Sequence, residues 1–162
     1  MRHFVLPMVL LLAACQSGPK GGEEAEPALV VFTPENLTRF TPEQAVMMAA
    51  SSAPRTVPGI FTLQVKASGK DNKRVYLNSE LDYRDQRNLT ISIDPRTAKV
   101  LAAKYGAPPE DYFKGRTIEV RGAARRVTIG FFENRRPTGL YYYQTHVTVG
   151  HAGQIQLVAP AS

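Results

Sequence analysis

Apolar and polar residues alternate with a period of two through much of the chain after residue 60. The alternation covers residues 61–66, 74–78 and 89–94, and the segments between these runs, such as 68–72, are rich in turn-forming residues. Successive side chains of a strand point to opposite faces, so this pattern predicts three strands that are each buried on one side.

Two helices are predicted between and before the strands. Thr41-Pro42-Glu43-Gln44 has the spacing of a capping box with proline at the first helical position, and Pro54 and Pro58 end that helix. It either packs on the following domain or serves as a spacer. Asp94-Pro95 starts a second helix, which we expect to bury one face formed by Val100, Leu101 and Tyr105 and to end at Gly106.

Strands resume after the second helix. Ile118 and Val120 are expected to point inward, and Val127, Ile129 and Phe131 continue the alternation beyond Gly122, which is interpreted as a bulge or bend. One face of a further strand carries Tyr143, Thr145, Val147 and Val149, and a short segment with Ile155 and Leu157 follows.

The order of three strands, one short helix and further strands is the plan of the OB-fold, a five-stranded Greek-key barrel. Residues 60–158 resemble small secreted bacterial OB modules of unassigned function. The similarity rests on residues 76–80, 88–93 and 114–122, together with 154–158, which resembles their closing strand. The expected fold is therefore all-β with one short helix, an OB-fold-like barrel preceded by a short helix and a flexible tether. Another small barrel or a split β-sandwich is the competing fold.

The N-terminus has the pattern of a secretory leader. Arg2 and His3 precede the apolar run Phe4–Ala14, and Leu12-Ala13-Ala14-Cys15 resembles the lipobox of bacterial lipoproteins. That resemblance implies cleavage before Cys15, lipid on its sulfur, and a membrane anchor in the cell envelope. Gln16 lacks the inner-membrane retention signal of the family, so the resemblance favours the outer membrane. A plain signal peptide, or a buried helix with an incidental cysteine, is the alternative.

The predicted organisation has four parts. They are a signal peptide over 1–14, the lipidated cysteine and flexible tether over 15–40, a short helix and linker over 41–59, and the OB-fold-like domain over 60–162.

Composition and charge narrow the function classes. The chain has 162 residues and a formal net charge of +6, and its single cysteine excludes an intramolecular disulfide framework. Residues 60–162 carry a net +7, whereas residues 16–59 carry −2. Nucleophile-elbow, phosphate-loop and zinc-protease motifs are missing, so we expect no catalytic residue, no metal site and no cofactor. Asp82, Asp85 and Asp94 are interpreted as turn and helix caps.

Basic and aromatic side chains on the predicted second and third strands and their loops are the candidate ligand-binding residues. They are Lys66, Lys73, Arg74, Tyr76, Asn78, Thr90, Arg121, Arg126, Arg135 and Arg136. Cations interleaved with rings suit anionic polymers. The sequence thus favours a membrane-anchored, non-enzymatic lipoprotein that binds an anionic envelope polymer, a lipid surface or a protein partner. A nucleic-acid-binding OB-fold is the alternative, disfavoured by the compartment, and a solvated surface without a specific ligand also fits. The oligomeric state stays open.

Overall fold

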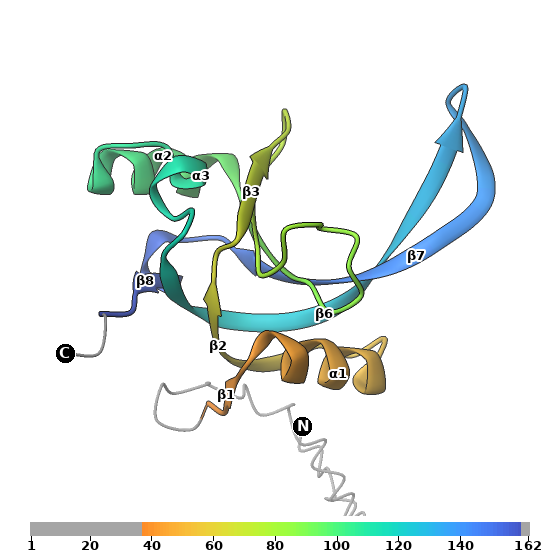
Figure 1. Cartoon of the computed structure of the whole chain (residues 1–162), viewed down its shortest axis with the longest axis horizontal. Coiled ribbons are helices and arrows are strands. Elements are labelled where there is room, and N and C mark those ends of the chain that lie inside the picture. The colour runs from red at the N-terminus through yellow and green to blue at the C-terminus, as the bar shows by residue number, and fades with distance from the viewer. Residues whose placement is uncertain (1–36, 160–162) are drawn as a thin grey trace, which may run out of the picture. The chain divides into compact units, whose positions relative to one another are not determined.

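A computed structural model describes residues 37–159, which form a mostly β unit with a curled, mixed sheet and helices packed around it (Figure 1). The strands are β1 (Arg39–Phe40), β2 (Val57–Gln64), β3 (Ala67–Lys70), β4 (Val75–Asn78), β5 (Leu89–Ile93), β6 (Thr117–Glu133), β7 (Arg136–Val149) and β8 (Ile155–Leu157). The helices are α1 (Pro42–Ser52), α2 (Pro95–Tyr105), α3 (Pro109–Tyr112) and the 3₁₀ helix η2 (Ala152–Gln154).

The two ends of the path of paired strands from β2 to β3 meet at one segment of the chain. β2 pairs antiparallel with β6, β6 with β7, and β7 runs parallel to β5, which pairs antiparallel with β4 and then β3. Only Val65 and Lys66 separate β2 from β3. The Val65 amide donates to the Arg116 carbonyl before β6, and the Lys66 amide donates to the Asn78 carbonyl of β4, each at 2.9 Å. One bent segment therefore joins both ends of the sheet.

Local sequence signals set the helix ends where they were expected. Thr41 caps α1, and its capping box with Gln44 is complete. The Asp94 carboxylate accepts hydrogen bonds from the amides of Arg96 and Thr97 at the start of α2. Gly106 ends α2 with φ of 75°, a left-handed conformation that glycine adopts without strain.

The core lies inside the curl of the sheet. Phe61, Leu77 and Ile91 are fully buried there, and α1 contributes Ala45 and Ala49 to the same cluster. Helix α1 thus packs on the domain and is not a detached spacer.

The prediction for α2 was wrong at one position. Leu101 is buried, but Val100 is 56 % exposed because the turn of the helix carries it to the solvent side.

The β6–β7 hairpin extends well beyond the rest of the curled sheet (Figure 1). We call residues 125–144 the arm. Asn134 and Arg135 both have positive φ, which gives the two-residue turn that matches the twist of a hairpin. Phe131 continues the predicted alternation of β6, and Tyr143 shares a face with the buried Val147 and Val149, yet they are 45 % and 44 % exposed. Alternation continued past the end of the core, so the pattern could not reveal where burial stops.

Two features of the later strands differ from expectation. Gly122 pairs in regular register with Gly59, and it is small because a Cβ there would lie 2.7 Å from the Val147 side chain. The irregular register lies instead between Gly130 and Phe132. The C-terminal segment does not close the sheet. β8 pairs with the start of β6, while β7 bridges β5 and β6.

Candidate ligand-binding groove

A groove of about 570 Å³ lies over β3, β4 and β5 between the 79–88 loop and the arm. Its apolar and aromatic lining comes from Leu81, Tyr83, Ile129, Tyr142 and Tyr76. Its polar lining includes Lys70, Asp71, Asn78, Thr90, Gln144 and His146. Rings on three separate elements surround a floor that can form hydrogen bonds.

The floor is a buried network of polar side chains. Asn78 and Thr90 are 7 % and 3 % exposed, although the strand alternation placed them on the outer face. Thr90 Oγ1 donates to Asn78 Oδ1 at 3.0 Å, and Asn88 Nδ2 donates to both, at 2.9 Å and 3.2 Å. The 79–88 loop returns over β4 and β5 at this point and covers the outer face.

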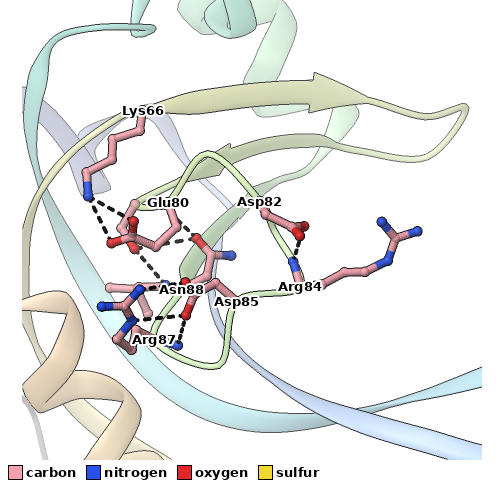
Figure 2. A network of polar contacts seen from close by, with 9 residues as sticks. Lys66, Glu80, Asp82, Arg84, Asp85, Arg87 and Asn88 are labelled. Carbon is pink, nitrogen blue, oxygen red and sulfur yellow. Dashed lines mark hydrogen bonds and ion pairs between the residues drawn. The ribbon is translucent and has the colours of Figure 1, made fainter.

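The 79–88 loop is shaped by its own side chains, as Figure 2 shows. The Asp82 and Asp85 carboxylates accept the amides of Arg84 and Arg87, each at 2.9 Å, so both act as turn caps as predicted. The Arg87 guanidinium, bound to Asp85, lowers the pKa of that carboxyl to about 2. The Asn88 side chain accepts the Glu80 amide at 3.1 Å, which ties the start of the loop to its end.

A chain of hydrogen bonds links the arm to this loop across the groove. His146 Nε2 lies 2.7 Å from Gln144 Oε1, and Gln144 Nε2 donates to the Tyr142 hydroxyl at 2.9 Å and the Tyr83 carbonyl at 3.2 Å. Burial lowers the pKa of His146 to about 4, and the charges of Arg125 and Arg74 add to the effect. His146 is therefore neutral at pH 7, and with Nε2 protonated it donates to Gln144.

Cations lie at the margins of the groove. Arg74 is half-buried and donates to Ser92 Oγ at 3.3 Å, and Arg84 lies 4.6 Å above the centre of the Tyr83 ring. Lys70 forms an ion pair with Glu110 at 2.7 Å. Asp71 accepts the Tyr76 hydroxyl at 3.1 Å. The groove lining is thus mixed in charge at Lys70 and Asp71, and the cations of Arg74 and Arg84 lie next to lining residues.

The structure gathers only part of the predicted binding set. Tyr76, Asn78 and Thr90 line the groove. Arg74 and Lys73 border a neighbouring depression beside α2. Lys66 lies 2.9 Å from Glu80, an ion pair drawn in Figure 2 that spans from the β2–β3 junction to the 79–88 loop.

The remaining predicted arginines lie elsewhere. Arg121 borders a different depression, formed with His151 and Gln154. Arg126 stacks 4.3 Å above the ring of Tyr143. The groove-lining Ile129 pairs across the hairpin with Tyr142, whereas Tyr143 pairs with Thr128. Because adjacent residues point to opposite faces, Arg126 lies on the face away from the groove. Arg135 lies in the tip turn of the arm, and Arg136 is the first residue of β7.

Sequence reasoning missed most of the groove lining. The larger or polar side chains that it missed include Asp71, Leu81, Tyr83, Ile129, Gln144 and His146. The one available signal was Tyr141-Tyr142-Tyr143, where alternation separates Tyr142 from its neighbours. Tyr142 faces the groove, and Tyr141 and Tyr143 lie exposed on the other side of the arm, so the triplet contributes nothing to the core.

Within residues 37–159, no group of three or more His, Cys, Asp or Glu side chains is placed to hold a metal ion. Among the helices of that same segment, none has the length and apolar character to cross a bilayer. Cys15, the predicted leader and most of the predicted tether lie outside the described residues.

Comparisons with known proteins return structural likeness only. No family model matches the chain, and no curated protein matches its sequence. An aspartyl-tRNA synthetase from Entamoeba histolytica matches with a TM-score of 0.44 and 15% identity over 96% of this chain and 29% of its own. A proposed aspartyl-tRNA synthetase from Leishmania major Friedlin matches with a TM-score of 0.42 and 12% identity over 85% of this chain and 24% of its own. The chain spans less than a third of either synthetase.

Proposed function

We propose that the β unit is an OB-fold and that its groove binds single-stranded nucleic acid. The pairing order supports the OB-fold. When the bent β2–β3 segment is counted as one strand, it pairs with the second and fourth strands, β4 and β6, and the third strand, β5, runs parallel to the fifth, β7. Helix α2 lies between the third and fourth strands, as it does in a Greek-key barrel of this kind.

The position of the groove supports the ligand class. OB-folds bind oligonucleotides and oligosaccharides on the face of strands two and three, between the first and last loops. Here the corresponding elements are β4 and β5, the turn before Arg74, and the arm. The observation that carries the proposal is the set of three tyrosines, Tyr76, Tyr83 and Tyr142, around one groove. Arg84 stacks on the Tyr83 ring, and Arg74 lies two residues before Tyr76, next to the start of β4. Rings can stack on successive bases while cations follow the phosphates.

Fluorescence anisotropy of a labelled oligothymidylate of about 15 nucleotides, titrated with the full chain, tests this proposal. We expect saturable binding that weakens as salt rises, with a log–log slope of about −0.7 for each phosphate contacted. A duplex of the same length should bind more weakly, because its bases are already stacked on one another. Equal affinity for single strand and duplex, or no binding at 50 mM salt, would contradict the proposal that the groove binds single-stranded nucleic acid.

A second function is favoured by the residues around Cys15. A lipid on that cysteine would hold the domain, without enzymatic activity, at the cell envelope, with an anionic envelope polymer, a lipid surface or a protein partner as its ligand. The variant Cys15→Ser should then move from the membrane fraction to the soluble fraction of the producing cells. A variant that still sediments with membranes contradicts the anchor. Binding of an acidic polysaccharide in the groove, together with no binding of oligothymidylate, would favour this second function.

A further inference from the structure

The arm leaves one edge of β6 without a neighbouring strand. β2 pairs with β6 as far as Val57 opposite Ala124, and β7 occupies the other edge from Ala124 to Glu133. Within the part of the chain that the structure describes, residues 125–133 therefore have no strand on the side opposite β7. Along such an edge every second residue turns its amide and carbonyl outward, where another strand can pair with them. A two-stranded ribbon is also only marginally stable in water unless further strands join it.

The two edges of the arm differ in how well they resist pairing. The outer edge of β7 carries Pro137, which has no amide hydrogen to donate. Gly139, with a φ of 83°, lies in a stretch of β7 where the pairing with β6 is irregular. Residues 125–133 of β6 contain neither proline nor lysine. The β6 edge does carry charges at Arg125, Arg126 and Glu133, and its register with β7 shifts between Gly130 and Phe132. It nevertheless keeps every backbone amide, so it is the more open of the two edges.

The chemistry of this edge is complementary to itself. Outward-facing amides occur at every second residue, so two identical antiparallel strands can pair only when the numbers of opposed residues add to an even sum. Among the even sums, 258 places Glu133, the sole acidic residue of the arm, opposite Arg125. The same register sets Val127 opposite Phe131, Arg126 opposite Phe132, and Ile129 opposite itself. Neither Arg125 nor Glu133 forms an ion pair within the described residues.

We propose that a second copy of this chain pairs with the β6 edge to form a two-fold dimer, with Ile129 at the axis and Arg125 opposite Glu133. A contact of this kind is closed and self-complementary, because each pair occurs twice. It would also cover Phe131 and Phe132, which are 45 % and 69 % exposed. Opposite charges and aromatic–aliphatic pairs directly across an antiparallel ladder are stabilising, whereas like charges there are destabilising.

A charge swap tests both the dimer and its register. Sedimentation equilibrium of the full chain should show a reversible monomer–dimer transition. Arg125→Glu and Glu133→Arg should each raise the dimer dissociation constant by about tenfold or more, because each creates two like-charge pairs. The double variant with both changes should return close to the original value. Arg96→Glu, on exposed helix α2, is the matched charge control and should leave the transition unchanged.

Cross-linking at the axis gives an independent readout. In a Cys15→Ser background, Ile129→Cys should form an intermolecular disulfide under mild oxidation, because directly opposed strand residues lie within disulfide range. Thr128→Cys faces Gly130 in this register and should cross-link far more slowly. A chain that stays monomeric at 100 μM, a double charge variant that fails to recover, or equal cross-linking at 128 and 129 would each overturn the proposal. Ile129 also lines the groove, so nucleic-acid binding is tested on the unaltered chain. Failure of the dimer and failure of the groove proposal are then distinguishable.

Discussion

Removal of the Asn88 side chain should release the loop that forms one wall of the groove. Asn88 is 2 % exposed and uses both ends of its amide. In Asn88→Ala, Thr90 still donates to Asn78 and Ser79 still accepts the Leu89 amide, but the Glu80 amide and the Ser79 hydroxyl lose their acceptor. One orphaned buried donor costs about 1–3 kcal/mol, and the small cavity adds to that loss. We expect the free energy of unfolding to fall by about 2–3 kcal/mol.

Urea unfolding followed by far-ultraviolet circular dichroism measures this change. The dependence of the unfolding free energy on urea concentration should be the same for both chains, which indicates that both unfold in a two-state manner. Gln86→Ala is the matched control, because Gln86 is exposed in the same loop, and it should stay within about 0.5 kcal/mol of the unaltered chain. Asn88→Asp should be at least as damaging at pH 7, since it sets a carboxylate against the Asn78 and Tyr83 oxygens. A loss below about 0.5 kcal/mol for Asn88→Ala would refute the reasoning that this network holds the loop.

Three further changes test other parts of the structure. Gly59→Ala should cost about 1–3 kcal/mol in urea unfolding, because its Cβ would lie 2.6 Å from the Phe40 ring, whereas Gly69→Ala meets nothing within 4 Å and should be tolerated. Asp94→Ala should cost about 1 kcal/mol through the lost cap of α2, and an unchanged unfolding midpoint would contradict that role. The pKa of His146 is about 4 in the folded chain against 6.5 for an ordinary histidine. The unfolded chain therefore binds the proton first, and stability falls as pH drops from about 6.5 to 4, by at most about 3 kcal/mol. His146→Gln should flatten this pH dependence; an equally steep curve in that variant would assign it to other groups.

Short-range signals in the sequence predicted the helix ends and the alternating core strands. Thr41, Asp94 and Gly106 act through backbone groups within four residues, so their roles can be read locally. The burial of Thr90 could not be read this way. It depends on Asn88 and on the path of a loop that returns over both strands.

The candidate site was predicted only in part for a related reason. A period of two assigns each residue to a face, but it does not reveal which face meets a groove once the sheet curls. Arg121 and Arg126 lie on the same strand, β6, yet one borders a depression beside η2 and the other stacks on Tyr143 of the arm. The curvature of β6 and the change of its partner from β2 to β7 near Ala124 are long-range features.

The central claim is that three tyrosine rings bind successive bases in one groove. The most direct test measures oligothymidylate affinity for Tyr76→Ala, Tyr83→Ala and Tyr142→Ala beside Tyr141→Ala, whose ring is 57 % exposed on the far side of the arm. Each stacked base contributes about 1–3 kcal/mol, so each groove variant should weaken binding by about fivefold to more than a hundredfold. Tyr141→Ala should bind as the unaltered chain does. Equal affinities for all four variants would contradict the account.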